Sequence, residues 1–304
     1  MYYLVYGILY LISLLPLRLL FFISDGFYGL AFHVIKYRRD VVMNNLTIAF
    51  PEKTEAEKII IAKKFYHNFI DSFIETIKML SVNEKFILKH FTGNWQIINE
   101  VLKTRESCHI LLGHTFNWEL GNHAISLNLD HAFLVVYMPI GNKIFNRLFM
   151  ELREKGRTKL LSAHNMRKDF MPYRNIKYIL ALAADQNPGN PRYAYWLNFF
   201  DRPTPFVTGP EKGARARNLP VFFCYIEKVR RGYYNLIISM GEENPQLLPE
   251  GAVTVKFVRY LEHVIRLQPD MWLWSHKRWK HEWKEEYLNL WIDQQPVSKP
   301  ITEM

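Results

Sequence analysis

The hydrophobic pattern begins with an apolar stretch at the N-terminus. Residues 2–23 read YYLVYGILYLISLLPLRLLFFI, in which Arg18 is the single charged residue. About 20 apolar residues are enough to cross or deeply enter a bilayer. The stretch lacks the basic start and small-residue cleavage site of a secretory signal. Pro16 and Arg18 disfavour a simple spanning helix, and a buried helix of a soluble protein is the alternative. We expect a membrane anchor helix over residues 1–24.

The next part of the chain, residues 38–80, has a helical pattern. Its apolar residues recur at three- and four-residue steps, which is typical of helices with one buried face. Thr54 followed by Glu57 predicts a capping box at a helix start. Just before this part, the segment Lys36-Tyr37-Arg38-Arg39 is strongly basic. By the positive-inside rule, this cluster places the body of the protein on the cytoplasmic side of the membrane.

From about residue 106, short apolar runs alternate with amphipathic stretches. The runs are CHILLG, AFLVVY, YILALAA, PVFFCYI and YYNLIISM. This alternation predicts an α/β fold with a mixed central sheet flanked by helices. No repeat or linker interrupts it, so we expect a single domain over residues 25–304. Catalytic residues of such folds lie beyond the strand ends. His114, Asp185 and the segment after Phe200 all follow apolar runs, and we expect them at one edge.

The composition points to an anionic partner. The net charge is +10, which fits nucleic acid, anionic lipid or an acidic carrier protein. Aromatic residues make up 15% of the chain, which suits either contact with lipid headgroups or a large ordinary core. Cys108 and Cys224 lie inside apolar runs without metal-site spacing, so we expect both to be reduced and buried.

The segment SCHILLGHTFNWELG carries the clearest candidate chemistry. His114 and Glu119 are five residues apart and would not face each other on one continuous helix. They meet if His114 lies in the loop after a strand and Glu119 in the first turns of the next helix, with Gly113 permitting a sharp exit. A histidine base oriented by a carboxylate suits acyl transfer to a hydroxyl. A core histidine without a catalytic role is the alternative.

Three further segments carry candidate chemistry. Asp185 in ADQNPG directly follows a predicted strand, as an active-site carboxylate or as part of an Asx turn. In FFDRPTPFVTGPE, Thr208 and Glu211 predict a capping box at a helix N-terminus, a place suited to anions or to water. Segment 270–280, DMWLWSHKRWK, mixes cations with three tryptophans. It fits nucleic-acid stacking, a membrane or phosphate-gripping edge, or a solvated basic face.

In this order, these segments resemble the bacterial lipid A biosynthesis acyltransferases of the lauroyl/myristoyl type, within the lysophospholipid acyltransferase superfamily. The resemblance runs from the N-terminal apolar helix to about residue 280, and FFDRPTPFVTGP and DMWLWSHKRWK are its most specific parts. It implies a glycerolipid acyltransferase-like fold. It also implies that His114 is the general base and that Glu119 is the carboxylate that orients it.

The resemblance also implies a set of substrate-binding residues: Arg153 (with Arg147 as a rival), Asp185, Thr208, Gly209 and Arg278. In this interpretation, Arg153 holds a phosphate or polarises the thioester. Thr208 and Gly209 lie beside the acyl donor, and Arg278 grips a phosphate of the acceptor.

The function that the resemblance implies is transfer of a fatty acyl chain to a hydroxyl of a lipid A precursor. The donor is an acyl carrier protein thioester, with coenzyme A left open, and no metal or organic cofactor is needed. The location is the cytoplasmic face of the inner membrane, next to anionic lipids. Met138 stands where many members have arginine, and ADQNPGN has one acidic residue where many have two. Another glycolipid or aminolipid acceptor, or an inactive lipid-binding homologue, therefore stays open. No RRM, KH, helix-turn-helix or zinc pattern supports a nucleic-acid binder.

Overall fold

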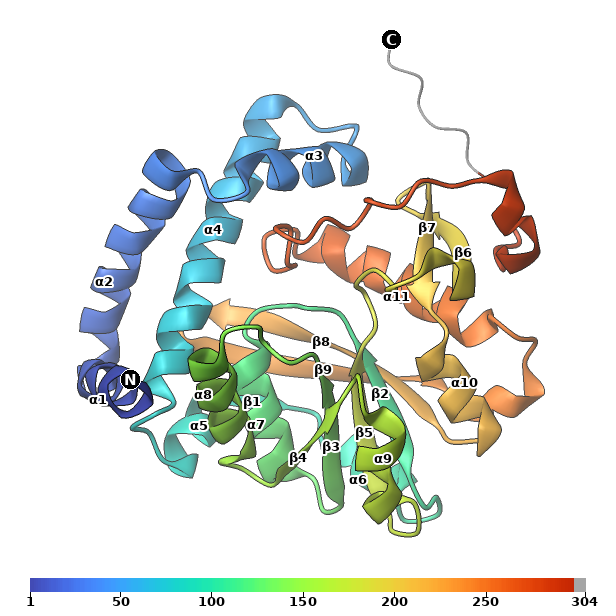
Figure 1. Ribbon diagram of the computed structural model, residues 1–304, viewed down its shortest axis with the longest axis horizontal. Coiled ribbons are helices and arrows are strands. Elements are labelled where there is room, and N and C mark those ends of the chain that lie inside the picture. The colour runs from blue at the N-terminus through green and yellow to red at the C-terminus, as the bar shows by residue number, and fades with distance from the viewer. Residues whose placement is uncertain (298–304) are drawn as a thin grey trace.

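A central sheet organises the protein, as the computed structural model of residues 1–297 shows (Figure 1). Its seven strands lie in the order β1-β9-β8-β2-β5-β3-β4. They are β1 (Phe91–Gly93), β2 (Cys108–Leu112), β3 (Ala132–Tyr137), β4 (Thr158–Ser162), β5 (Tyr178–Ala183), β8 (Val221–Arg230) and β9 (Tyr233–Glu242). Neighbouring strands are parallel except β8 and β9. The predicted mixed α/β sheet is confirmed, and five of its strands coincide with the five apolar runs, whereas β1 and β4 were not predicted.

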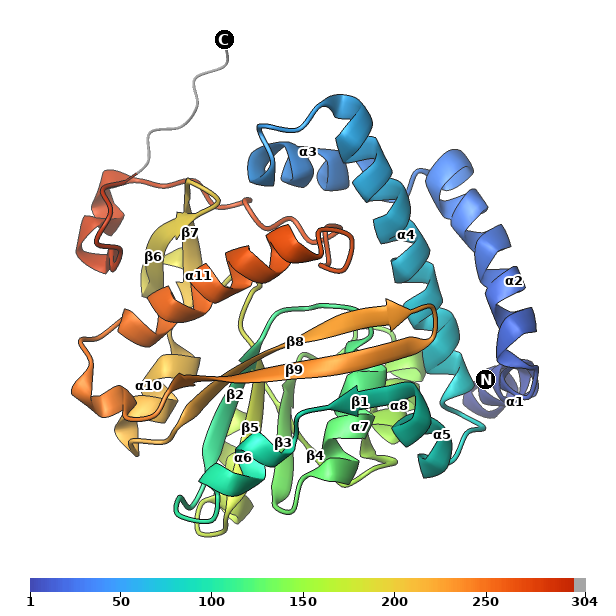
Figure 2. The ribbon, with the colours of Figure 1, turned by 180° about the vertical axis from the view of Figure 1, so that it is seen from behind.

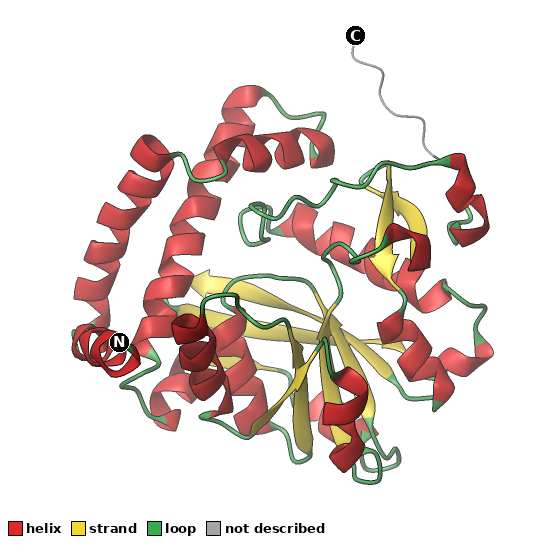
Figure 3. Ribbon diagram, in the orientation of Figure 1, coloured by secondary structure: helices red, strands yellow, loops and turns green. Residues whose placement is uncertain are grey.

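Helices cover both faces of this sheet (Figures 2 and 3). The helices that follow the N-terminal apolar stretch are α3 (Arg39–Ala49), α4 (Glu55–Lys78), α5 (Glu84–His90), α6 (Gln96–Val101), α7 (Trp118–Asn128), α8 (Lys143–Glu154), α9 (Met166–Phe170), α10 (Gly209–Ala216) and α11 (Ala252–Leu267), with short 3-10 helices at Met171–Tyr173, Pro191–Tyr193, Pro245–Leu247 and Glu285–Leu290. Gly121 of α7 lies beside Ile226, whereas Phe257 of α11 packs on Phe223 with ring centroids 5.5 Å apart. Residues three apart on a strand point to opposite faces, so α7 and α11 cover opposite faces of β8.

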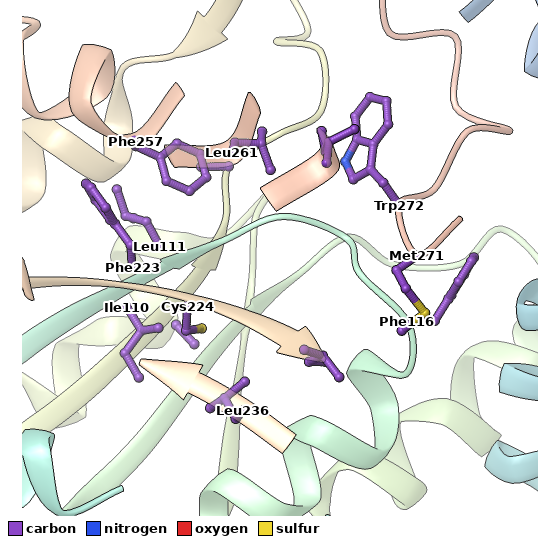
Figure 4. Close-up of a cluster of buried hydrophobic side chains, with 14 of the residues drawn as sticks. Ile110, Leu111, Phe116, Phe223, Cys224, Leu236, Phe257, Leu261, Met271 and Trp272 are labelled. Carbon is purple, nitrogen blue, oxygen red and sulfur yellow. The ribbon is translucent and has the colours of Figure 1, made fainter. Parts of the chain in front are cut away.

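The hydrophobic core extends along the sheet to the carboxyl ends of its parallel strands. Figure 4 shows Phe223, Phe257 and Leu261 together at one side of β8, and Phe116 and Met271 near the end of the cluster. All of these side chains are buried. Cys108 and Cys224 are buried and form no disulfide, as predicted.

The helical region 38–80 consists of two helices, α3 and α4, with Pro51 between them. The predicted capping box at the start of α4 is confirmed. The backbone N–H of Glu57 donates to Thr54 Oγ1 at 3.3 Å, and the backbone N–H of Thr54 donates to Glu57 Oε2 at 2.8 Å. This reciprocal pair satisfies two donors that the first helical turn leaves free.

The N-terminal apolar stretch forms two helices instead of one. Helix α1 (Tyr2–Ser13) ends before Pro16, and α2 (Leu17–Gly29) continues as a π-helix over Leu30–Ile35. Proline cannot donate to the preceding turn, which explains the break. The helical stretch Leu17–Ile35 is the one among residues 1–297 that is long and apolar enough to cross a membrane. The predicted boundary at residue 24 therefore falls inside α2, and residues 298–304 of the predicted domain lie outside the described residues.

A hairpin that the sequence pattern did not predict follows the fifth strand of the sheet. It pairs β6 (Ala194–Phe199) with β7 (Arg202–Val207) in a separate antiparallel sheet. The two turn residues, Phe200 and Asp201, have φ values of 51° and 53°. Left-handed conformations suit a two-residue hairpin, but Asn-Gly is their usual signal and Phe-Asp is not.

The predicted capping box of Thr208 and Glu211 is wrong. Thr208 is the N-cap residue of α10, but its side chain makes no capping hydrogen bond. The Glu211 carboxylate instead accepts from the backbone N–H groups of Gly251, at 2.6 Å, and Thr254, at 2.8 Å. These donors belong to the first turn of α11, so Glu211 satisfies the start of a different helix.

Candidate active site

The carboxyl ends of two neighbouring strands bring His114 and Asp185 together. Strands β2 and β5 are parallel, with Leu112 opposite Ala183. His114 Nδ1 lies 2.6 Å from Asp185 Oδ1, and the backbone N–H of His114 donates to Asp185 Oδ2 at 2.8 Å. The Asp185 side chain is 2% exposed and that of His114 is 23% exposed. Asp185 therefore orients a histidine ring that an incoming molecule can still reach.

Gly113 makes this close arrangement possible. A Cβ atom at this position would lie 2.7 Å from Leu261 Cδ1 and 3.4 Å from Asp185 Oδ2. A side chain here would therefore displace the end of the Leu261 side chain and crowd the carboxylate. Glycine suits this position because the side chains of Leu261 and Asp185 approach it closely. The sequence pattern indicated a different reason, the backbone freedom needed for a sharp exit from the strand.

Segment 270–280 supports the same pair from the other side. The indole N–H of Trp272 donates to Asp185 Oδ2 at 2.7 Å. The backbone N–H of Leu273 donates to the carbonyl of His114 at 3.1 Å. Trp272, Trp274 and Trp279 are all buried, so they do not form a stacking platform or a solvated face.

The charges of the pair stabilise each other. Burial alone would raise the pKa of the Asp185 carboxyl, but the charge of His114 and the hydrogen bonds from His114 and Trp272 outweigh it and lower that pKa to about 2. Burial alone would lower the pKa of the His114 imidazole, but the charge and hydrogen bond of Asp185 hold that pKa above its ordinary value. Asp185 is thus an anion that favours the imidazolium form of His114.

The other ring nitrogen of His114 is the one that can accept a proton. When Nδ1–H donates to Asp185, Nε2 carries the lone pair. The Gln186 side-chain amide lies 3.2 Å from Nε2. A substrate hydroxyl that replaces this amide would meet the lone pair directly. The sequence pattern did not identify Gln186, although its position directly after Asp185 is a signal for it.

Glu119 lies in the first turn of α7, as predicted, but it does not orient His114. Its carboxylate accepts from Arg153 Nε at 2.9 Å and from Arg153 Nη2 at 2.5 Å. No hydrogen bond joins Glu119 to His114 within residues 1–297, because Asp185 already occupies Nδ1. The predicted His114–Glu119 dyad is therefore corrected to a His114–Asp185 pair beside a Glu119–Arg153 pair. The planar guanidinium matches the carboxylate with two parallel hydrogen bonds, which accounts for this pairing.

Of the two candidate arginines, Arg153 is the one near His114. Burial alone would lower the pKa of its guanidinium, but the hydrogen bonds and charge of Glu119 raise it. Arg147 is exposed, pairs with Glu151 at 2.8 Å and lies 4.0 Å from the ring centroid of Tyr2. Arg147 therefore joins α8 to the N-terminal helix.

A buried carboxyl group supports the start of α7. Asn117 is the N-cap of this helix, and its Oδ1 accepts from the backbone N–H of Leu120 at 3.2 Å. Its amide donates to Glu75 Oε2 at 2.8 Å, and the Tyr234 hydroxyl donates to the same oxygen at 2.7 Å. Burial raises the pKa of Glu75 to about 7. The hydrogen bonds of Glu75 thus fix the segment between His114 and Glu119.

Arg278 lies between the β6–β7 hairpin and the loop after β5. It is fully buried and donates to the carbonyl of Pro205 at 2.8 Å and to Asn187 Oδ1 at 3.0 Å. Burial lowers the pKa of its guanidinium to about 9. The side chain thus links the β6–β7 hairpin to the loop after β5. Its predicted grip on an acceptor phosphate stays a prediction.

Thr208 and Gly209 lie at the start of α10, which packs beside the beginning of β2. A Cβ at Gly213 of this helix would lie 3.3 Å from the ring of His109, about 16 Å along the strand from His114. The described contacts of residues 1–297 do not bring Thr208 or Gly209 to His114. Their predicted place beside the acyl donor stays a prediction.

Fold and site together define an α/β protein in which a buried aspartate orients a partly exposed histidine at the carboxyl edge of the sheet. Residues 1–281 match the sequence model of the bacterial lipid A biosynthesis acyltransferases, and the chain belongs to this family. The protein is therefore an acyltransferase.

Two curated relatives agree with this assignment. The chain is 22% identical over 281 residues to a lipid A biosynthesis lauroyltransferase of Escherichia coli K12, covering 90% of this chain and 89% of that protein. It is 24% identical over 277 residues to a lipid A biosynthesis acyltransferase of Haemophilus influenzae, covering 88% and 86%.

Proposed function

We propose that the protein transfers a fatty acyl chain from an acyl carrier protein thioester to a hydroxyl of a lipid A precursor, at the cytoplasmic face of the inner membrane. The observation that carries this proposal is the His114–Asp185 pair, with Nδ1 and Oδ1 2.6 Å apart and His114 partly exposed. Family membership supports the reaction class. The net charge of +10 supports both an acidic carrier protein and an anionic lipid surface as partners.

In the proposed reaction, His114 Nε2 takes the proton of the acceptor hydroxyl while the hydroxyl oxygen attacks the thioester carbonyl carbon. Asp185 stabilises the imidazolium that forms. The tetrahedral intermediate collapses by breaking the carbon–sulfur bond, and the proton passes from His114 to the leaving thiolate. An ester and a free thiol result, so no nucleophilic serine or cysteine is required.

Arg153 supplies the positive charge beside this base. Its side chain is 18% exposed while Glu119 holds two of its donors. A cation fixed in this way suits either the thioester oxygen that becomes negative or a phosphate of the acceptor. Glu119 is then the residue that positions Arg153.

The acceptor has one alternative that a particular residue favours. Met138 directly follows β3 at the carboxyl edge of the sheet and is exposed. Met138 thus places an apolar side chain where the arginine of many family members would bind an acceptor phosphate. This difference favours another glycolipid or an aminolipid as the acceptor.

Product analysis tests the proposed function. The full-length protein is incubated with acyl carrier protein or coenzyme A thioesters and with a lipid A precursor, an aminolipid or a phospholipid mixture, and products are read by mass spectrometry. The proposal predicts that the lipid A precursor gains one acyl chain, faster from the carrier protein. If another lipid gains the acyl chain, that lipid is the acceptor in place of the lipid A precursor. If transfer is faster from coenzyme A thioesters, coenzyme A is the donor in place of the carrier protein. No gain with any pair would contradict the proposed activity.

A further inference from the structure

Helices α1 and α2 form one outer layer of the molecule. In Figures 1 and 2, both helices lie along the same outer edge, next to α4, and α1 is seen end-on at the foot of α2. Both axes therefore run along this edge layer instead of pointing away from the body. The layer presents many exposed apolar side chains, namely Tyr3, Leu4, Ile8 and Leu11 of α1, Leu14 directly after it, and Leu19, Phe22, Phe27, Leu30, Val34 and Ile35 of α2 and its continuation.

The inner face of α2 is fixed to the body by polar contacts. Ser24 is buried, and its hydroxyl donates to Asp71 Oδ1 of α4 at 2.6 Å. Arg231, in the turn between β8 and β9, donates from Nη2 to Asp25 Oδ1 at 2.6 Å and to Asp71 Oδ1 at 2.7 Å. His67 of α4 adds a contact of 2.9 Å from Nε2 to Asp25 Oδ1. The middle of α2 is thus part of an ion-pair network shared with the folded domain.

This network lies where a spanning helix would be deepest in lipid. Asp25 is one residue from the middle of the apolar stretch Leu17–Ile35. A carboxylate at the centre of a bilayer is costly, and crossing would also draw Arg231 and Asp71 into the hydrocarbon or break their contacts with α2. Helices that lie flat in one leaflet avoid both of these costs.

We infer that α1 and α2 lie flat within one leaflet, with their exposed apolar faces in lipid and the contacts of α2 with the body intact, so that α2 does not cross the membrane. Amphipathic helices of this kind bind by apolar burial and by attraction of cations to anionic headgroups. Exposed cations stand at both ends of α2, with Arg18 at its start and Lys36 after its continuation. The inference rests on the proposed membrane location.

Cysteine labelling at the two ends of α2 tests this orientation. Arg18 and Lys36 are 18 residues apart, about 27 Å along a helix, close to the roughly 30 Å of a hydrocarbon core. The native Cys108 and Cys224 are buried, so Arg18→Cys and Lys36→Cys each add one reactive thiol. A membrane-impermeant maleimide is applied to spheroplasts and to inverted membrane vesicles. We expect both positions to react in inverted vesicles and neither to react in spheroplasts. Reaction of the two ends from opposite sides, or of neither end before detergent is added, would overturn the inference.

A matched pair of variants tests the role of the ion pair. Asp25→Leu removes the partner of Arg231, whereas Gly26→Leu adds the same side chain where no atom lies within 4 Å. Trypsin cleavage after Lys36 in vesicle-bound protein should be several-fold faster in Asp25→Leu than in Gly26→Leu or wild type. Equal rates would overturn the claim that the network holds α2 on the body.

Fractionation separates failure of this inference from failure of the proposed function. Labelling from opposite sides in membrane-bound, active protein contradicts only the flat orientation. Recovery of wild-type protein in the soluble fraction contradicts the membrane location as well.

Discussion

At the scale of single residues, Asp185 sets the pKa and the orientation of the His114 ring. As the proposed base, His114 must be neutral to accept a proton, so kcat/KM should fall as pH decreases through the pKa of His114, which Asp185 holds above its ordinary value. Asp185→Asn removes this charge. The acid limb of its residual activity should move to lower pH, and the rate at neutral pH should fall by roughly 10² to 10⁴. A pH profile of kcat/KM measures both effects.

Glu119→Gln is the comparison that separates the two carboxylates. It weakens the two hydrogen bonds to Arg153 but leaves Asp185 on Nδ1. The rate should fall while the acid limb moves less than in Asp185→Asn. A large shift in Glu119→Gln together with no shift in Asp185→Asn would restore the assignment that the sequence motif indicated.

Arg278 illustrates a residue whose chemistry the sequence could not place. A cation among tryptophans predicts binding, but burial against Pro205 and Asn187 gives it a structural role. Arg278→Lys keeps the charge and loses the planar fork. It should lower the free energy of unfolding by about 2 kcal/mol, measured by urea denaturation, and leave KM for the acceptor unchanged. A raised KM with unchanged stability would contradict the structural role.

At the scale of helices and strands, the sequence predicted those features that depend on residues close together in the chain. The Thr54–Glu57 capping box and the five apolar runs are confirmed because they depend on neighbours in the chain. The strand order could not be predicted in this way. His114 meets Asp185 because β5 inserts between β2 and β3, and no periodicity within a strand encodes that choice.

Two other local features could not be predicted from the sequence, for a related reason. The β6–β7 turn uses Phe200 and Asp201 in left-handed conformations, without the glycine or asparagine that signals such a turn. Glu211 satisfies the start of α11 instead of the helix on which it stands. In both cases, tertiary contacts decide the local conformation.

Helix α4 supports the site through Glu75, and this predicts a pH-dependent stability. Burial raises the pKa of Glu75 from 4.5 to about 7, so the folded state keeps a proton that the unfolded state releases between these values. The free energy of unfolding contributed by this group should therefore fall as pH rises from about 4.5 to about 7. Glu75→Gln should flatten that slope in urea denaturation, whereas Glu55→Gln, exposed on the same helix, should not. Equal slopes in wild type and Glu75→Gln would contradict this account.

At the scale of the whole molecule, the exposed layer of α1 and α2 should govern membrane binding. The sequence predicted an apolar anchor, but not its break at Pro16 or its packing on α4, because composition does not show what a helix packs against. Changing Phe22, Leu30 and Val34 together to glutamine should reduce binding to anionic vesicles several-fold. The melting temperature should stay unchanged because all three side chains are exposed. Unchanged sedimentation with vesicles would contradict this role.

The central claim is that His114 is the general base of acyl transfer, and one comparison tests it most directly. Acyl transfer to the lipid acceptor is measured by mass spectrometry for wild type, His114→Ala and the control His164→Ala, whose histidine is exposed after β4. All three proteins should be folded and bind vesicles equally. The account predicts acylated product with wild type and His164→Ala, and a loss of roughly 10² to 10⁴ in rate with His114→Ala. Comparable product from His114→Ala would contradict it and return His114 to a structural role.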